Sequence, residues 1–313
     1  MLPKVSIQIP TYNQQQYIAK AVESCLAQDY PNLEIVVADD CSTDRTREIV
    51  EGFRDPRLRY FRNEINIGRV ANYRKALYEY CAGDWVVNLD GDDYYTEPGF
   101  ISRGVRLITE YSAKGFDVVF YQAVMKLAND AGDRVTHKTH HSLGVKEHDA
   151  FLNYYPVIYR RNNFFGHLTT LYDRKRAMAT GFYETDILNT DLESLAKLSF
   201  QGAVILDNYC VGVWREHHSN ATWKMRAAFR KDGYEILQRL ESYRSSLPGK
   251  GSVANEEMER EHKELYLEQL AEYGLFFGLL RTRKWIGIKY ARTPKLLVKA
   301  FIKNVKYKTT GRL

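Results

Sequence analysis

Asp90-Gly91-Asp92-Asp93 places three carboxylates within four residues, directly after the apolar run Trp85-Val86-Val87-Asn88-Leu89. This run has the composition of a buried strand, and the turn after such a strand can aim several side chains at one point beyond the sheet. Unpaired carboxylates repel one another, whereas Mg²⁺ or Mn²⁺ favours their ionised form and takes oxygen ligands from protein and phosphate together. The cluster therefore indicates a divalent cation site, with a solvated acidic turn as the alternative.

Two earlier segments have the same arrangement, in which an apolar run is followed by a polar exit. Lys4 to Pro10 is typical of a strand and leads into Thr11-Tyr12-Asn13, and Leu33 to Ala38 is typical of a strand and leads into Asp39-Asp40. Apolar positions from Ile18 to Leu26 recur at helical spacing. These patterns predict a helix after each strand, the second running to about residue 53.

The alternation continues along the chain. Residues 58–61 are expected to form a third strand and residues 68–80 a third helix, before a turn at Gly83-Asp84 leads into the strand that precedes Asp90. Alternating strands and helices predict an α/β fold with a doubly wound, mostly parallel sheet and flanking helices. Ligands of such sheets bind where the strands end, so the three polar exits predict a nucleotide site.

Four motifs, in this order and at these spacings, resemble the family 2 glycosyltransferases of the GT-A fold. They are Val5 to Asn13, Asp39 to Asp44, Asn66-Ile67-Gly68 and Asp90 to Asp93. The resemblance is strong over residues 3–100, weaker over residues 160–220 and absent beyond. It implies an inverting transfer of a sugar from a nucleoside diphosphate donor, UDP by default, with Mn²⁺ or Mg²⁺ bridging the diphosphate. Gln8 and Cys41 depart from the aliphatic residue and the glycine common in the family, and neither change removes a functional group.

The resemblance implies roles for residues of the first two motifs. Pro10 and Tyr12 are expected to line the pocket for the base, where an aromatic ring packs against it. Asp40 is expected to accept a hydrogen bond from the N–H of the base. Asp39 either contacts the donor or accepts hydrogen bonds from the backbone of its own loop.

Roles for the later motifs follow in the same way. Asn72, with Arg69 nearby, is expected to reach ribose or phosphate, although a solvated helix face explains Arg69 equally well. Asp90 is suited to the ribose or sugar hydroxyls and Asp92 to the metal. Asp93 is expected to be a second metal ligand or a partner of the first.

The resemblance places the catalytic base on the acceptor side, in an acidic pair that precedes a helix. Asp191 takes that position, with a threonine in place of the first acid, and Glu193 and Asp186 are the competing candidates. An acid at a helix start is also explained by the helix macrodipole. Further on, either His217 or His218 is expected to contact the diphosphate or the metal.

Charge and cysteine usage limit the remaining possibilities. The net charge is +6, but residues 281–313 hold eleven Lys or Arg and no acid, which leaves 34 basic against 39 acidic residues before them. The four cysteines form no C-x-x-C pair, so neither a zinc site nor a disulfide framework is expected. Histidines between residues 122 and 166, an irregular stretch suited to acceptor loops, are interpreted as loop residues.

The domain organisation follows from these patterns. Residues 1–220 are predicted to form the GT-A domain, with a nucleotide-sugar half at 1–100 and an acceptor half at 101–220. Residues 221–313 are predicted to form a helical extension that ends in a basic amphipathic tail. No stretch approaches the roughly 20 apolar residues of a membrane-spanning helix. The tail is interpreted as an interfacial anchor on anionic lipid, with a helix packed on the core as the alternative.

The resulting prediction is a metal-assisted hexosyltransferase of polysaccharide biosynthesis, cytoplasmic and peripheral on the inner face of the cell membrane. Its partners are a nucleoside diphosphate sugar, a lipid-linked or surface-glycan acceptor and an anionic membrane surface, and no nucleic acid is expected. A nucleotidyltransferase is one alternative, but Pro10 to Gln16 lacks a Gly-rich phosphate loop. A membrane-tethered, non-catalytic protein that binds nucleotide sugars is the other.

Overall fold

A computed structural model describes residues 2–129, 136–137, 144–146, 166–217, 220, 236, 239–240 and 242–247. Residue contacts divide the chain into two units, residues 1–225 and residues 226–313. The predicted motifs all lie in the first unit.

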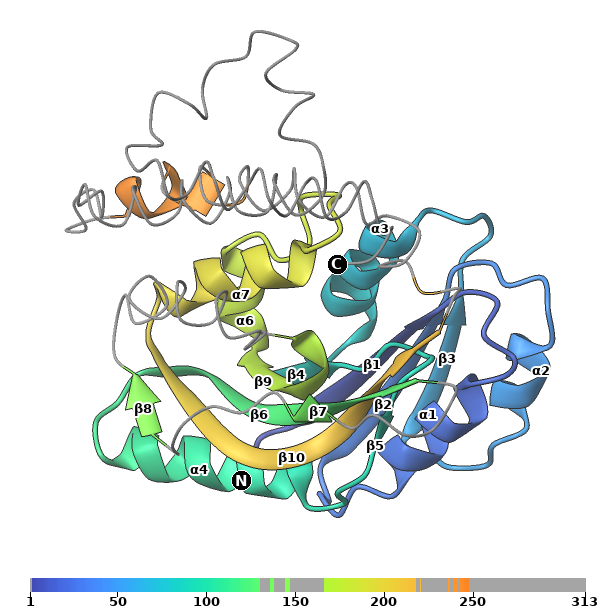
Figure 1. The fold of residues 1–313 in the computed structure, drawn as a ribbon, viewed down its shortest axis with the longest axis horizontal. Helices are drawn as coiled ribbons and strands as arrows, with labels where there is room; N and C mark the ends of the chain where they lie inside the picture. Colours follow the sequence, from blue (N-terminus) through green and yellow to red (C-terminus); the bar gives the residue numbers. More distant parts are fainter. Residues whose placement is uncertain are drawn as a thin grey trace, which may run out of the picture. The chain divides into compact units, whose positions relative to one another are not determined.

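The first half of this unit alternates strands and helices, as the sequence predicts (Figure 1). Its elements are β1 (Val5–Thr11), α1 (Ile18–Leu26), β2 (Leu33–Asp39), α2 (Thr46–Glu51), β3 (Leu58–Arg62), α3 (Arg69–Lys75), the π-helical η1 (Ala76–Tyr80) and β4 (Trp85–Asn88). The helix predicted over residues 68–80 is thus an α-helix that ends in a π-helical turn.

The second half contains two long strands together with several short ones. Its elements are β5 (Tyr94–Tyr95), α4 (Phe100–Ala113), β6 (Val118–Asn129), β7 (Thr136–His137), β8 (Gly144–Lys146), the 3₁₀ turn η2 (His167–Thr169), β9 (Thr170–Asp173), α6 (Arg174–Ala179), α7 (Thr190–Ser199) and β10 (Ala203–Glu216).

The strands of the described residues form one sheet in the order β3-β2-β1-β4-β9-β6-β10-β5, with β7 paired to β6 and β8 to β10. Strands β1 to β4 pair in parallel, and so do β6 and β10, whereas β9 runs antiparallel between β4 and β6. The α/β fold with a wound, mostly parallel sheet is therefore confirmed. The parallel register brings the ends of β1, β2 and β4 to one edge of the sheet.

Helices cover both faces of the sheet, with α1 and α4 on one side and α3, α6 and α7 on the other (Figure 1). Every residue of β1 and β2 is buried in consequence. The apolar positions of α1 face the core, where Ile18, Val22 and Cys25 are fully buried. Burying a Val or Ile side chain is worth about 1.5–3 kcal/mol, so this layer is a large part of what holds the site-bearing edge in place.

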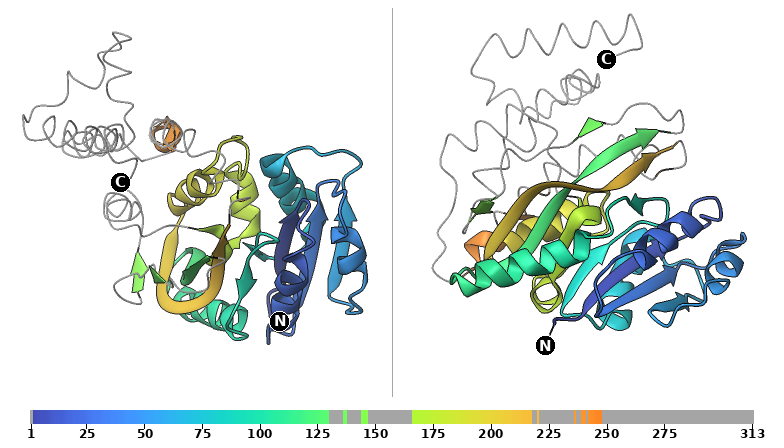
Figure 2. Two further views of the ribbon diagram at one scale, coloured as in Figure 1. Left: turned by 45° about the vertical axis from the view of Figure 1, so that its right-hand side comes forward. Right: turned by 90° about the horizontal axis from the view of Figure 1, so that it is seen from below.

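Two elements differ from the sequence-based expectation. Residues 122–129, expected to be irregular, continue β6 because they pair with β9 and β10. Residues 203–206 and 210–214 are two apolar runs, each typical of a separate strand, but they form one bent strand, β10, whose curvature is visible in Figure 2. Its register shifts beside Asp207, a buried carboxylate that pairs with Arg103 and accepts a hydrogen bond from Tyr121.

Of residues 226–313, the structure describes a short helical segment in which Ile236 and Leu240 are buried. The predicted basic tail, residues 281–313, lies outside the described residues. Among the helices that the structure does describe, none combines the length and the apolar composition needed to span a bilayer.

Candidate active site at the ends of β1, β2 and β4

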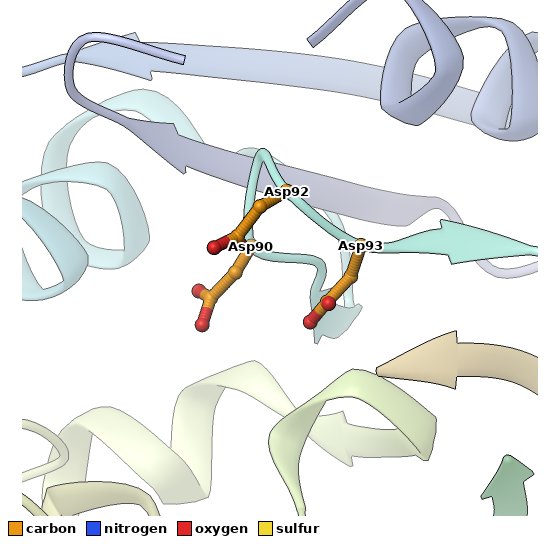
Figure 3. Close-up of side chains that lie close together, drawn as sticks. All are labelled: Asp90, Asp92 and Asp93. Carbon is orange, nitrogen blue, oxygen red and sulfur yellow. The ribbon is translucent and has the colours of Figure 1, made fainter. Parts of the chain in front are cut away.

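Asp90, Asp92 and Asp93 lie in the turn between β4 and β5 and point into the same space (Figure 3). One carboxylate oxygen from each lies within 4.8 Å of the other two. Burial and the charges of Asp92 and Asp90 raise the pKa of Asp93 well above its ordinary range. Oxygen donors held this close, one of them resisting ionisation, fit a Mg²⁺ or Mn²⁺ ion, whose charge removes the repulsion.

Asp90 is held by neutral and cationic neighbours. Its Oδ1 accepts hydrogen bonds from the Tyr73 hydroxyl at 2.9 Å and from Asn88 Nδ2 at 3.0 Å, and its Oδ2 lies 3.5 Å from His167 Nε2. Burial by itself raises the pKa of Asp90, but the positive field of His167, these hydrogen bonds and the charge of Arg69 together hold it below its usual value. Asp90 is therefore an ionised acceptor suited to hydroxyl groups.

Asp92 contacts two side chains that follow the end of β10. Its Oδ2 lies 3.0 Å from His217 Nε2 and 3.3 Å from Asn220 Nδ2. The imidazole of His217 stacks on the ring of Tyr17, with centroids 4.7 Å apart, and the Arg215 guanidinium lies 4.7 Å from that same ring. Of the two candidate histidines, His217 is thus beside the carboxylate cluster, while His218 lies outside the described residues.

The two carboxylates after β2 have different surroundings. Asp39 is fully buried and accepts hydrogen bonds from the backbone and hydroxyl of Ser42 and from the Tyr60 hydroxyl, so it supports its own loop. Asp40 accepts hydrogen bonds at 2.9 Å from the backbone N–H groups of Ile67 and Gly68.

Asn72 also takes part in the hydrogen bonds that hold the loop after β2. Its Nδ2 donates to the carbonyl of Ala38 at 2.8 Å, and its Oδ1 accepts from Asn63 Nδ2, which in turn donates to Asp40. Asn72 is buried. Both ends of its amide are thus engaged within the protein. Pro10 is buried in β1, whereas Tyr12 is 47% exposed at the end of that strand, where its ring is accessible to a ligand.

Asp191 lies in the first turn of α7 and is partly exposed. Burial lowers the pKa of the His167 imidazole, but the charge and hydrogen bond of Asp90 outweigh it and raise that pKa, and the charge of Asp191 adds to the rise. Glu193 is buried, pairs with Lys197 at 2.9 Å and accepts a hydrogen bond from Thr185. Asp186 is exposed. The charge of Asp191 thus acts on His167 and Arg69, two groups that also carry the field of Asp90.

The structure adds His167, which the sequence analysis did not single out. It lies in η2, is buried, and connects Asn88 and Asp90 to Tyr183. A histidine just before a short strand carries no distinctive spacing, so only its spatial neighbours reveal it. Among the histidines between residues 122 and 166, His137 lies in β7 and the others fall outside the described residues.

Comparison of the sequence with known proteins identifies the family that the motifs resemble. The model of glycosyl transferase family 2 matches residues 6–178. Poly(ribitol-phosphate) beta-N-acetylglucosaminyltransferase TarS of Staphylococcus aureus is 39% identical over 94 residues, which are 29% of this chain and 16% of that protein. GalNAc(5)-diNAcBac-PP-undecaprenol beta-1,3-glucosyltransferase of Campylobacter jejuni is 38% identical over 122 residues, 38% of each chain. The aligned parts span well under half the length of these relatives.

Solved structures share the fold. S. aureus TarS 1–349 in complex with UDP-GlcNAc has a TM-score of 0.61 at 21% identity, covering 90% of this chain and 75% of that one. The mannosyltransferase PcManGT from Pyrobaculum calidifontis, in complex with GDP-Man and Mn²⁺, has a TM-score of 0.56 at 19% identity, covering 97% and 88%. The GT-A architecture is thereby confirmed. Because the family model covers more than half of its length, the chain belongs to glycosyl transferase family 2.

Proposed function

We propose that the protein is an inverting glycosyltransferase that moves a sugar from a nucleoside diphosphate, UDP by default, to a hydroxyl of a glycan acceptor. One observation carries the proposal. The carboxylates of Asp90, Asp92 and Asp93 converge at the same sheet edge as the loops that hold Asp40 and Tyr12. A base site and a cation site at one edge suit a nucleotide with an attached diphosphate.

Asp92 and Asp93 are the residues that would hold a divalent cation, while Asp90 accepts hydrogen bonds from sugar or ribose hydroxyls. The close approach of the three carboxylates and the raised pKa of Asp93 support a cation at this position. When bound, Mg²⁺ or Mn²⁺ offsets the negative charge on the departing diphosphate. At the end of β10, the backbone N–H of Arg215 donates to Asp93 and its guanidinium adds positive charge, while His217, the residue after the strand, lies beside Asp92.

Asp191 serves as the general base. It removes the proton from the acceptor hydroxyl while that oxygen bonds to the anomeric carbon, and the bond from that carbon to the diphosphate oxygen breaks on the opposite face. General-base assistance of this kind contributes about 10²–10⁴-fold. The engagement of Glu193 with Lys197 and Thr185 supports Asp191 over Glu193 for the role.

The acceptor is a lipid-linked or surface-glycan intermediate. One relative is named as a glucosyltransferase of GalNAc(5)-diNAcBac-PP-undecaprenol, and another as an N-acetylglucosaminyltransferase of poly(ribitol-phosphate). The eleven basic residues within 281–313 support binding to an anionic surface on the inner face of the membrane. Each basic residue near such a surface is worth about 1 kcal/mol.

A thermal-shift panel tests the proposal on the full-length chain. UDP, GDP and dTDP, each with and without its sugar, are added with Mn²⁺ and with EDTA. A ligand present at 100 times its dissociation constant stabilises the native state by about 2.7 kcal/mol, which is readily detected as a raised melting temperature. We expect one nucleoside diphosphate to stabilise the protein, more strongly with Mn²⁺. If none of them does so under either condition, the proposal fails.

A further inference from the structure

His167 takes no part in the chemistry proposed above, yet it lies at the centre of the site. The residue is 8% exposed, and its Nε2 faces Asp90 Oδ2 at 3.5 Å and Asn88 Nδ2 at 3.2 Å. The edge of the ring also meets Tyr73, with centroids 5.3 Å apart. One side of the imidazole is therefore fixed to the end of β4, where the donor carboxylates begin.

The other side of the imidazole reaches the acceptor half. His167 Nδ1 lies 3.2 Å from the Tyr183 hydroxyl, and the backbone N–H of Tyr183 donates to Ser194 Oγ at 3.1 Å. Ser194 belongs to α7, the helix whose first turn carries Asp191. A chain of contacts thus runs from Asp90 through His167 and Tyr183 to the helix of the proposed base.

Tyr183 holds an unusual backbone conformation at this junction. Its φ is +58°, in the left-handed region that residues with bulky side chains rarely adopt. Such conformations cost of order 1–3 kcal/mol and persist only where the surroundings over-determine them. The buried ring, packed against Tyr73 and Phe182, and the contact to His167 are part of those surroundings.

A second link reaches the same segment from the donor half. Arg69, at the start of α3, donates from Nη2 to the carbonyls of Ile187 at 2.9 Å and Leu188 at 3.1 Å. These carbonyls lie directly before α7, so Arg69 fixes the helix entry while His167 fixes the turn before it. Two separate contacts therefore determine where α7 begins relative to Asp90.

We propose that His167 is a positioning residue for sugar transfer, which sets the distance between Asp90 and Asp191 by joining the end of β4 to the turn before α7. The inference rests on the proposed function, because it assigns Asp90 to the donor and Asp191 to the proton of the acceptor hydroxyl. Misplacing a reacting group by about 1 Å can cost about 10²-fold in rate. Most of the proposed UDP contacts, namely Asp40, Tyr12 and the cation ligands Asp92 and Asp93, are not hydrogen-bond partners of His167, so UDP affinity is expected to change little.

Two variants test the link from both sides. His167→Ala removes the ring, and Tyr183→Phe removes only the hydroxyl that meets Nδ1. Both are compared with Tyr30→Phe, a matched control in which a buried tyrosine loses its hydrogen bond to the carbonyl of Pro3, away from the site. UDP affinity is measured by calorimetry with Mn²⁺, and turnover as UDP released from the UDP-sugar that the wild type uses fastest, among UDP-glucose, UDP-galactose and their N-acetylated forms.

We expect UDP affinity within about threefold of wild type for all three variants. Turnover of His167→Ala is expected to fall about 10²-fold. Turnover of Tyr183→Phe is expected to fall as well, whereas Tyr30→Phe is expected to retain wild-type turnover. Because His167→Ala and Tyr183→Phe break one link, the double variant loses little more than His167→Ala alone.

Hydrogen exchange supplies a readout that does not depend on turnover. Backbone amides of residues 187–195 are expected to exchange faster in His167→Ala and Tyr183→Phe, and at the wild-type rate in Tyr30→Phe. Unchanged exchange in this segment, or turnover of His167→Ala within threefold of wild type, overturns the inference. Failure of the wild type to bind UDP or any other nucleoside diphosphate instead overturns the proposed function, so the two failures are distinguishable.

Discussion

Replacing Asp40 by Asn removes a charge while leaving the size of the side chain unchanged. In the structure Asp40 Oδ1 accepts from Asn63 Nδ2 and from the Ile67 N–H, and Oδ2 accepts from the Gly68 N–H, each at 2.9 Å. An asparagine has one oxygen. If that oxygen keeps the two bonds of Oδ1, its NH₂ group faces the Gly68 N–H, donor against donor.

The magnitude follows from the bonds that are lost. A hydrogen bond to a charged group contributes about 1.5–3 kcal/mol, so Asp40→Asn is expected to lower the free energy of unfolding by about that amount. The same carboxylate has a further lone pair on Oδ2, which is the proposed acceptor for the N–H of the base. Losing that contact weakens UDP binding roughly ten- to hundredfold, since 1.4 kcal/mol corresponds to a factor of ten.

The assay pairs urea denaturation with calorimetric titration of UDP in Mn²⁺. Asp84→Asn is the control, because Asp84 is exposed, accepts a hydrogen bond from the Lys4 N–H and precedes β4 rather than following it. Its UDP affinity should equal that of wild type. If Asp40→Asn loses stability as expected but binds UDP within twofold of wild type, the base pocket is not at Asp40.

Three further predictions concern the base, the fold and the tail. Asp191→Asn should lower turnover about 10²-fold or more while UDP affinity stays within a few fold; if Glu193→Gln behaves in this way instead, the base is misassigned. Glu34→Gln should lower the free energy of unfolding by about 1.5–3 kcal/mol at pH 7, because Glu34 accepts hydrogen bonds from Lys4 and from backbone. Burial raises the pKa of Glu34, but these bonds outweigh it and hold the pKa below 4.5. The difference in unfolding free energy between wild type and variant should therefore persist above that pH and shrink as the pH falls through the lowered pKa. Denaturation at a series of pH values measures this. Deleting residues 281–313 should abolish salt-sensitive sedimentation with phosphatidylglycerol vesicles and preserve UDP binding; equal sedimentation of both forms argues against the anchor.

The donor half of the fold was predictable because each strand is an apolar run with a polar exit, and because parallel strands bring their ends together. The carboxylates of Asp90, Asp92 and Asp93 converge for this reason. What sequence could not supply is the direction of each side chain once it is buried. Asn72 was expected to face a ligand, yet its amide is used between Ala38 and Asn63.

Contacts between distant segments were the other part that sequence could not supply. His167, in the turn that leads into β9, meets Asn88 at the end of β4, 79 residues earlier, and nothing in the spacing of either residue indicates the pairing. Likewise Asp207, beside which the register of β10 shifts, pairs with Arg103, 104 residues earlier in the chain. Such features arise from packing, which local patterns do not encode.

Calorimetry of UDP binding in the presence and absence of Mn²⁺, on wild type and Asp92→Asn, tests the central claim most directly. If Asp92 helps to hold a cation that neutralises a diphosphate, wild type binds UDP more tightly with Mn²⁺ than with EDTA, and Asp92→Asn loses that gain while keeping the weaker, metal-free binding. Equal UDP affinity of the two proteins under both conditions would contradict the assignment of this carboxylate cluster to a metal-bound nucleotide.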